Sequence, residues 1–283
     1  MLVTGNEILQ DAHRKGYGVG AFNVNNMEIV QAIIEAAEET NSPVILQASQ
    51  GGLKYAGIEY VAELGKLAAR NARVPVAVHL DHGTDFAQVM LCIRHGFSSV
   101  MIDGSQLELE DNIAITKKVV EVAHAVGVSV EAELGKIGGT EDDITVDEKD
   151  ATFTDPEEAK YFVEQTRVDS LAIAVGTAHG VYQGEPNLDF DRIKTIREML
   201  DIPLVLHGSS GVADEDIEKA ISAGISKINI DTDLRIAFTG AIKQFLKEDP
   251  ENIDPRKILS PARKGMKKVI MEKMKIFGSA GRA

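Results

Sequence analysis

Three histidines of this 283-residue chain share a local pattern that suggests metal chemistry. They are His82 in LDHG, His179 in TAHG and His207 in LHGSSG, and a glycine follows each of them. Three protein ligands with an open fourth position are typical of a catalytic zinc site, and the glycines would let a substrate approach closely. Iron, manganese and cobalt use similar ligands, but nitrogen donors without thiolates favour zinc. We therefore expect one catalytic Zn²⁺ ion bound by these imidazoles.

The other four histidines lie in contexts that predict structural roles. His13 and His124 lie in polar or helical stretches, without a partner at a strand end. His95 precedes Gly96, where a cation suits the last turn of a helix and glycine ends it. His79 lies inside a predicted strand, which favours a hydrogen-bonded position in the core or behind the metal ligands.

Short apolar runs alternate with segments of helical periodicity along the whole chain. Eight such runs are found, at 19–24, 43–49, 75–82, 99–105, 128–135, 170–180, 203–211 and 225–233. Their near-continuous hydrophobicity is typical of parallel strands that are covered on both faces. Helical periodicity marks 27–39 and 112–126, and Asp155 followed by Pro156 is a helix start.

Strand–helix alternation repeated eight times favours a closed barrel, so we predict an α/β fold with a single (β/α)8 TIM barrel. One catalytic domain is expected to span residues 1–283, with an amphipathic C-terminal helical extension at 255–277. A doubly wound open sheet is the alternative. It is less favoured because no G-x-G-x-x-G fingerprint follows the first predicted strand.

Polar side chains gather where the predicted strands end. The carboxyl ends of successive strands carry Asn23, Ser49, Asp81 with His82, Asp103, Glu133, His179, His207, and Asn229 with Asp231. Active sites of such barrels are built at that end. Strands generally end where polarity begins, which accounts for Asn23 and Ser49 but not for the convergence of histidines and carboxylates. The pattern predicts an active site at this rim.

The composition excludes several classes of function. The formal net charge is −14, so the surface repels nucleic-acid backbones and anionic membranes. The single cysteine, Cys92, permits no intrachain disulfide and lies in an apolar run that predicts a buried thiol. No apolar stretch reaches the roughly 18 residues of a membrane span, and the charged N-terminus does not resemble a signal peptide. We expect a cytoplasmic protein without nucleic-acid or membrane partners.

Six motifs, in matching order along essentially the whole chain, resemble those of the class II aldolases. They are LDHG at 80–83, SVMIDGS at 99–105, VSVEAELGKIGGTEDD at 128–143, GTAHG at 176–180, LVLHGSSG at 204–211 and KINIDTDLR at 227–235. This family includes the zinc-dependent fructose-1,6-bisphosphate and tagatose-1,6-bisphosphate aldolases. The resemblance implies a lyase of carbohydrate metabolism, in glycolysis and gluconeogenesis, that binds sugar bisphosphates and triose phosphates. It also implies homodimers or homotetramers.

The resemblance implies roles for individual residues. The three glycine-flanked histidines would be the zinc ligands, and Asp81 the acid/base beside them. Glu141 matches a mobile carboxylate that exchanges a proton at carbon 3. Asp103 and Glu133 match positions of a second or alternative metal location, and assistance by a monovalent cation stays open.

A further set of residues matches the substrate-binding segments of the family. It comprises Asn23, Ser49, Gly180, Gly208, Ser209, Ser210, Asn229, Ile230, Asp231, Thr232, Arg235 and Arg282. Ser49 matches a residue near the aldehyde half of the substrate. Arg235 and Arg282 match arginines associated with phosphate binding, the latter across a subunit boundary.

The expected reaction is reversible cleavage of fructose 1,6-bisphosphate to dihydroxyacetone phosphate and glyceraldehyde 3-phosphate. Breaking the bond between carbons 3 and 4 requires an electron sink, which Zn²⁺ provides by stabilising an enediolate. Asp81 would take the carbon-4 hydroxyl proton, and Glu141, on a glycine-flanked loop, would protonate carbon 3. Loops after strands 7 and 8 of such barrels commonly bind phosphate, which suits the GSSG segment at 208–211.

Several alternatives stay open. A Schiff-base aldolase would use a barrel lysine such as Lys227, although this lysine could equally pair with a barrel carboxylate. A metal-dependent hydrolase typically carries His-x-His on the first strand, which VGAFNV lacks. A sugar-phosphate sensor would bind ligand without turnover. Within the family, Asp231 and Arg235 resemble the fructose-type pattern, whereas TAHG also occurs on the tagatose side. Fructose 1,6-bisphosphate is favoured, with tagatose 1,6-bisphosphate as the alternative.

Overall fold

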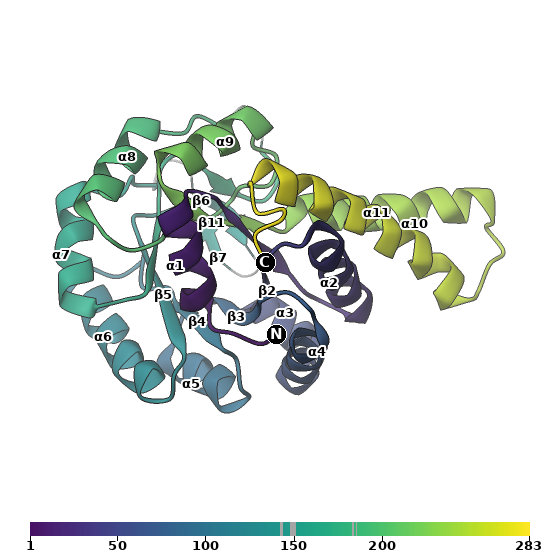
Figure 1. The fold of residues 1–283 in the computed structure, drawn as a ribbon, viewed down its shortest axis with the longest axis horizontal. Helices are drawn as coiled ribbons and strands as arrows, with labels where there is room; N and C mark the ends of the chain where they lie inside the picture. The colour runs from purple at the N-terminus through teal and green to yellow at the C-terminus, as the bar shows by residue number, and fades with distance from the viewer. Residues whose placement is uncertain (142–143, 148–150, 183, 185) are drawn as a thin grey trace.

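Parallel strands close into a barrel at the centre of the molecule (Figure 1). The structure is a computed structural model that describes residues 1–141, 144–147, 151–182, 184 and 186–283. The barrel follows the order β1-β11-β10-β8-β5-β4-β3-β2, and each neighbouring pair is parallel. Its strands are β1 (Val19–Asn23), β2 (Val44–Ser49), β3 (Val76–Gly83), β4 (Ser99–Ile102), β5 (Ser129–Leu134), β8 (Ser170–Ile173), β10 (Leu204–Leu206) and β11 (Ile225–Ile230). The predicted (β/α)8 TIM barrel is confirmed.

Helices lie around the barrel, at its amino-terminal end and in an extension beyond it. They are α1 (Gly5–Lys15), α2 (Met27–Thr40), α3 (Gln50–Ala56), α4 (Ile58–Asn71), α5 (Phe86–Arg94), α6 (Leu109–Ala125), α7 (Pro156–Thr166), α8 (Phe190–Met199), α9 (Asp214–Ala223), α10 (Thr232–Glu248) and α11 (Pro255–Ile276). The predicted helices at 27–39 and 112–126 are confirmed, and the Asp155 side chain caps α7 as expected. Among the described residues, no helix has the length and apolar character that crossing a bilayer requires.

The helix α1 closes the amino-terminal end of the barrel, a role that its largely polar sequence does not reveal. Thr4 and Glu7 form a capping box at its start. Its buried residues Ile8 and Leu9 pack against apolar side chains of β1, β2 and β3 that form a cluster separate from the main core. Because α1 covers this end, the opposite, carboxyl-terminal end is where the barrel interior can meet a ligand.

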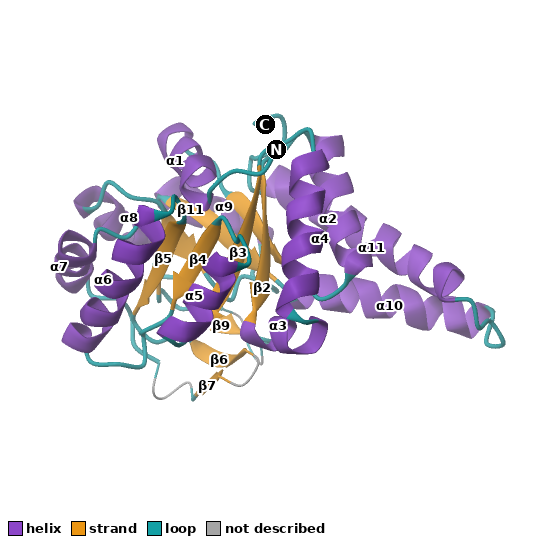
Figure 2. Cartoon of the chain, turned by 90° about the horizontal axis from the view of Figure 1, so that it is seen from below, coloured by secondary structure: helices purple, strands orange, loops and turns teal. Residues whose placement is uncertain are grey.

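A second sheet lies beyond the carboxyl-terminal end of the barrel (Figure 2). In it, β6 (Gly138–Glu141) pairs antiparallel with β7 (Ile144–Val146) and parallel with β9 (Ala178–His179). The predicted strand at 170–180 is therefore too long, because β8 ends at Ile173 and His179 belongs to β9. Between them Gly176 has a φ of 106°, a backbone conformation that favours glycine. The runs at 203–211 and 225–233 also leave the barrel early, at Leu206 and Ile230.

The helices α10 and α11 project from the barrel as a hairpin, which confirms the predicted C-terminal extension (Figures 1 and 2). The returning helix α11 packs against α10 and α2, and its residues Ile270 and Met274 are fully buried. The chain end then follows the end of α2, where the backbone N–H of Ala283 donates to the Asn41 carbonyl. This continuity of buried contacts between barrel and extension supports the prediction of one domain.

Replacing Ile270 by alanine should lower the free energy of unfolding of the whole chain, because truncating a fully buried isoleucine leaves a cavity. The expected loss is roughly 2–5 kcal/mol in urea unfolding followed by circular dichroism. Ile253→Ala is the matched control, since this isoleucine is 93% exposed between α10 and α11, and it should change stability by less than about 0.5 kcal/mol. A separate unfolding transition in the Ile270 variant would contradict the single-domain prediction.

Candidate active site

His82 occupies an irregular position near the end of β3. Between Leu80 and Gly83 the register shifts, so that three steps along β3 match two steps along β4. His82 itself has a φ of 49°, a left-handed conformation that is uncommon for residues other than glycine. Bulges re-aim side chains, and such backbone strain clusters at functional sites. Here the irregularity accompanies an imidazole directed toward two other histidines.

The three predicted metal ligands converge although they come from three segments. His82 lies on β3, His179 on β9, and His207 directly follows β10. The ring centroid of His82 is 4.6 Å from that of His207 and 5.0 Å from that of His179. One nitrogen of each ring lies within 4.8 Å of the other two. The geometry brings together the three nitrogen donors that the sequence singled out.

Two of these nitrogens nearly touch. Nε2 of His82 lies 2.8 Å from Nδ1 of His207. Two imidazole lone pairs repel at this distance unless a proton or a cation lies between them. Burial lowers the pKa of the His207 imidazole, and the neighbouring His82 lowers it further, so the neutral ring is favoured. Neutral imidazoles converging on one point suit a zinc ion, and the donor set therefore fits the predicted metal.

Two buried carboxylates extend the histidine cluster. Oδ2 of Asp103 lies 2.9 Å from Nδ1 of His82, and Oε2 of Glu133 lies 3.8 Å from Nδ1 of His207. Burial raises the pKa of the Asp103 carboxyl, but the hydrogen bond and charge of His82 outweigh it and hold this pKa well below its usual range. His82, Asp103 and Glu133 form a second set of donor atoms close enough to share a cation. The carboxylates thus lie where the family resemblance expects a second or alternative metal position.

Asp81 is completely buried and held by side-chain amides. Its Oδ2 accepts hydrogen bonds from Asn23 Nδ2 at 3.1 Å and Gln47 Nε2 at 3.0 Å, and its Oδ1 accepts from Asn229 Nδ2 at 3.1 Å. Gln47 also donates to Asn23 Oδ1 at 2.7 Å. The amides fix the orientation of the carboxylate without adding charge. Gln47 was not predicted, although a glutamine inside the apolar run at 43–49 is a signal that could have found it.

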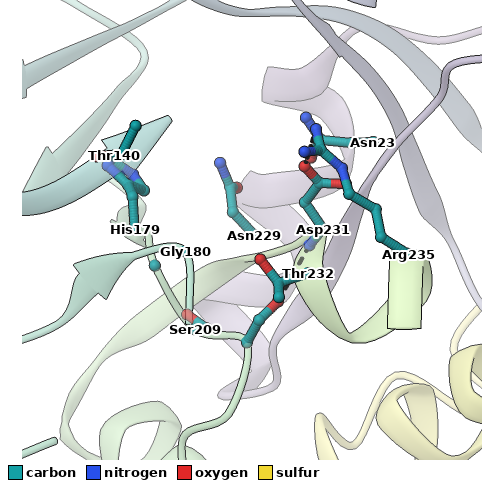
Figure 3. Close-up of a pocket in the computed structure, with 11 residues that line it drawn as sticks. Asn23, Thr140, His179, Gly180, Ser209, Asn229, Asp231, Thr232 and Arg235 are labelled. Carbon is teal, nitrogen blue, oxygen red and sulfur yellow. Dashed lines mark hydrogen bonds and ion pairs between the residues drawn. The ribbon is translucent and has the colours of Figure 1, made fainter. Parts of the chain in front are cut away.

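A pocket of about 80 Å³ opens at the carboxyl-terminal end of the barrel (Figure 3). It is lined by Asn23, Thr140, His179, Gly180, Gly208, Ser209, Ser210, Asn229, Asp231, Thr232 and Arg235. In the close-up, Asn229 lies between His179 on one side and the pair of Asp231 and Arg235 on the other. Nine of the twelve predicted substrate-binding residues are therefore brought to one cavity.

The loops after β10 and β11 are joined at the floor of this pocket. Ser210 Oγ accepts hydrogen bonds from the backbone N–H groups of Asp231 at 3.2 Å and Asp233 at 3.3 Å. Arg235 binds the Asp231 carboxylate through Nε at 2.9 Å, and its side chain is half exposed. The arginine therefore keeps donors available at the pocket mouth, in the region where such barrels commonly bind phosphate.

Three residues of the predicted substrate-binding set lie outside this pocket lining. Ser49 is buried, caps α3 by accepting from the Gly52 N–H, and pairs in register with Asp81. Ile230 is buried in the apolar core, between the pocket-lining residues Asn229 and Asp231. Arg282 stacks over Tyr17 and is not among the residues that line the pocket, and the C-terminus lies at the opposite end of the barrel from β6, β7 and β9 (Figure 2).

The small sheet holds His179 close to the barrel. A Cβ at Gly139 of β6 would lie 2.2 Å from the His179 carbonyl oxygen, so glycine is required for this approach. The Tyr182 hydroxyl accepts from the Ala178 N–H at 2.8 Å and donates to the Gly208 carbonyl at 2.7 Å. Burial raises the pKa of Tyr182 to about 12, which keeps this donor protonated. Neither Tyr182 nor Thr140 was predicted, because nothing in the local sequence marks their long-range contacts.

Glu141, the predicted mobile carboxylate, ends β6 and pairs with Ile144 across the turn to β7. Its side chain lies outside the described part of the structure, as do the adjacent positions 142 and 143. The backbone therefore places the Glu141 segment in the same sheet as His179.

Ionisable groups continue beneath the histidine cluster into the barrel. Glu131 binds His207 Nε2 through Oε1 at 2.8 Å and Lys227 Nζ through Oε2 at 2.8 Å. Burial raises the pKa of the Glu131 carboxyl, but Lys227 and the bond from His207 outweigh it and hold this pKa well below its usual range. His79 lies beside Lys227, in the buried position behind the metal ligands that the sequence predicted. Lys227 thus pairs with a barrel carboxylate, the second of the two roles considered for it.

Comparisons with known proteins agree with this site. The family model described as fructose-bisphosphate aldolase class-II matches residues 3–282. A fructose-bisphosphate aldolase of Thermus caldophilus is 52% identical over 306 aligned positions, covering 100% of both chains. A sulfofructosephosphate aldolase of Alkalicoccus urumqiensis is 48% identical, covering 99% of this chain and 98% of the relative.

A solved structure agrees as well. The crystal structure of the YdjI aldolase from Escherichia coli K12 is similar with a TM-score of 0.89, 40% sequence identity and 100% coverage of both chains. The matches extend over the whole barrel, including the segments that carry the histidine cluster, the Asp81 amides and the pocket. This chain, an aldolase of the lyase class, therefore belongs to the class II fructose-bisphosphate aldolase family.

Proposed function

We propose that this protein cleaves fructose 1,6-bisphosphate reversibly to dihydroxyacetone phosphate and glyceraldehyde 3-phosphate, with Zn²⁺ as its cofactor. The observation that carries the proposal is the convergence of His82, His179 and His207 beside the buried Asp81 carboxylate, at the edge of a polar pocket. Full-length relatives named fructose-bisphosphate aldolase support the choice of substrate.

The three imidazoles would hold the ion through His82 Nε2, His207 Nδ1 and one nitrogen of His179. When bound, zinc supplies a Lewis acid that withdraws electrons from the substrate carbonyl as the carbon–carbon bond breaks. The protein's own part is to aim the three imidazoles at one point, and burial, which lowers the pKa of His207, keeps that ring neutral. Asp103 and Glu133 are proposed to offer a second position to a divalent or a monovalent cation.

Asp81 is proposed as the base that takes the proton of the carbon-4 hydroxyl during cleavage and returns it during synthesis. Asp81 directly precedes the proposed zinc ligand His82 in the sequence. The carbon-4 hydroxyl of a substrate bound at the metal would therefore lie close to the Asp81 carboxylate. The amides of Asn23, Gln47 and Asn229 hold the carboxylate in one orientation. A second carboxylate, Glu141, is proposed to carry the proton to and from carbon 3.

The dihydroxyacetone phosphate half of the substrate is proposed to be bound by the rim segments that line the pocket. Gly180 and the segment from Gly208 to Ser210 offer backbone N–H groups, and Asn229 to Thr232 continue the same wall. Arg235 supplies a cation at the pocket mouth. Ser49, beside Asp81 in register, is proposed to lie near the aldehyde half, and Arg282 to reach the site of a neighbouring subunit.

We further propose a cytoplasmic homodimer or homotetramer with one catalytic domain per chain. The projecting α10–α11 hairpin supports association, because a hairpin outside the barrel provides a face for a second copy. Its exposed Ile236 is an apolar residue suited to such a face. Light scattering that gives the mass of a monomer would exclude both assemblies.

Removal of metal separates the zinc mechanism from a Schiff-base mechanism. We expect EDTA to abolish aldol cleavage and stoichiometric Zn²⁺ to restore it, whereas Mg²⁺, which prefers oxygen ligands, should not. Borohydride added with substrate should leave activity and protein mass unchanged, because Lys227 is engaged by Glu131. Activity that survives EDTA but is lost to borohydride would overturn the zinc proposal.

Substitution of Asp81 tests its role as the base. Asp81→Asn should lower kcat about 10²–10⁴-fold, because an amide of the same shape cannot accept the hydroxyl proton. Zinc content measured by mass spectrometry should stay unchanged, since Asp81 is not in the ligand set. Asp191→Asn, at an exposed position of α8, is the matched control and should keep full activity. Near-normal kcat in the Asp81 variant would exclude the proposed role.

The sugar preference can be measured directly on the zinc-loaded protein. We expect kcat/KM for fructose 1,6-bisphosphate to exceed that for tagatose 1,6-bisphosphate, with Asp231 contributing to the discrimination at carbon 4. A hydrogen bond to a charged group is worth about 1.5–3 kcal/mol, which corresponds to a ratio of roughly 10–150-fold that Asp231→Ala should reduce. A sulfonated fructose phosphate should be included, because one relative is a sulfofructosephosphate aldolase. If kcat/KM is higher for tagatose 1,6-bisphosphate or for the sulfonated fructose phosphate, that compound becomes the proposed substrate in place of fructose 1,6-bisphosphate.

A further inference from the structure

A chain of polar and ionisable side chains runs through the barrel interior below the histidine cluster. It links Ser99, His79, Lys227, Glu131 and His207. Ser99 Oγ lies 2.8 Å from His79 Nδ1, and Lys227 Nζ lies 3.4 Å from His79 Nε2. Glu131 follows at 2.8 Å from Lys227, and His207 at 2.8 Å from Glu131. The side chains of Glu131, Lys227 and His207 are at most 2% exposed, so no bulk water competes for these contacts.

The contact with Glu131 decides which nitrogen of His207 carries the proton. A carboxylate paired with an ammonium group has no proton to donate, so Glu131 Oε1 can only accept from Nε2–H of His207. In the neutral ring the other nitrogen, Nδ1, then has a free lone pair. Nδ1 is the nitrogen that faces His82 Nε2 at 2.8 Å, at the proposed metal position.

We propose that Glu131 and Lys227 are positioning residues, which lock His207 in the Nε2–H tautomer and aim its Nδ1 at the metal. Lys227 holds Glu131 as an acceptor, and Glu131 holds His207. A carboxylate behind a ligating histidine also raises the basicity of that ligand, and its loss typically weakens metal binding 10–100-fold. The inference rests on the proposed zinc site. It assigns a positioning role to the buried Lys227, the residue that would form the Schiff base in the alternative mechanism.

A purely structural role for the pair makes a different prediction. If Glu131 and Lys227 only neutralise each other, replacing both by neutral side chains should leave the barrel stable and the metal site intact, whichever neutral residue stands at 131. The positioning role requires an acceptor at 131, because only an acceptor selects the tautomer of His207. The two roles can be distinguished by comparing two variants that both lack the charges of Glu131 and Lys227. One of them keeps a hydrogen-bond acceptor at position 131, and the other has none.

Two double variants make this comparison. In Glu131→Gln/Lys227→Met the amide oxygen can still accept from His207, whereas in Glu131→Leu/Lys227→Met nothing can. We expect the apo forms of both to fold with similar Tm, and the leucine variant to bind Zn²⁺ about 10–100-fold more weakly than the glutamine variant in competition with a chromophoric chelator. Ser129→Ala, another buried polar change on β5, should leave zinc affinity unchanged.

Equal zinc affinity of the two double variants would overturn the positioning role. A second measurement is independent of their folding: ¹⁵N NMR of the histidine-labelled, unsubstituted apo protein should show His207 protonated at Nε2, and protonation at Nδ1 would also overturn it. Failure of the unsubstituted protein to bind zinc would overturn the proposed function instead, so the two failures are distinguishable.

Discussion

The hydrogen bond between Glu131 and His207 joins the buried interior of the barrel to the histidine cluster of the candidate active site. Both side chains are enclosed by strands, so each polar atom must find a partner within the protein or carry the full cost of desolvation. The carboxylate meets this condition with Lys227 on one oxygen and His207 on the other. From His207 the contacts continue to His82 and then to Asp103. Strands β3, β5 and β11 and the segments after β4 and β10 are tied together through this one series.

Asp81 is held by a different physical means. Its partners are neutral amides from β1, β2 and β11, and within the described part of the chain no lysine or arginine donates a hydrogen bond to its carboxylate. The amides orient both carboxylate oxygens without placing a positive charge beside them. The two networks meet at adjacent residues of β3, so that the proposed base and a proposed metal ligand are fixed by one strand.

The third histidine depends on segments outside the barrel. His179 lies on β9, and its position relies on the close approach of Gly139 and on the Tyr182 hydroxyl that joins β9 to Gly208. By contrast, β3, which carries His82, and β10, which precedes His207, are each paired with a barrel strand on both sides. His179 and Glu141 therefore share one small sheet outside the barrel, on its neighbouring strands β9 and β6.

The sequence by itself determined the barrel, the helical extension and the members of the histidine cluster. Apolar period and strand–helix alternation are local properties, and residues at the carboxyl ends of parallel strands must share one rim, so His82, His207 and Asp81 could be predicted from position alone. Only the tertiary structure decided that Glu131 and Gln47 support them, that Lys227 is paired, that Tyr182 anchors β9, and that Arg282 lies at the far end within one chain. These are contacts between residues 24 to 265 positions apart, whose partners depend on strand register and side-chain direction. In strands buried on both faces the apolar run is nearly continuous, so it lacks the alternation that would specify the register, and the supporting contacts could not be predicted from the sequence.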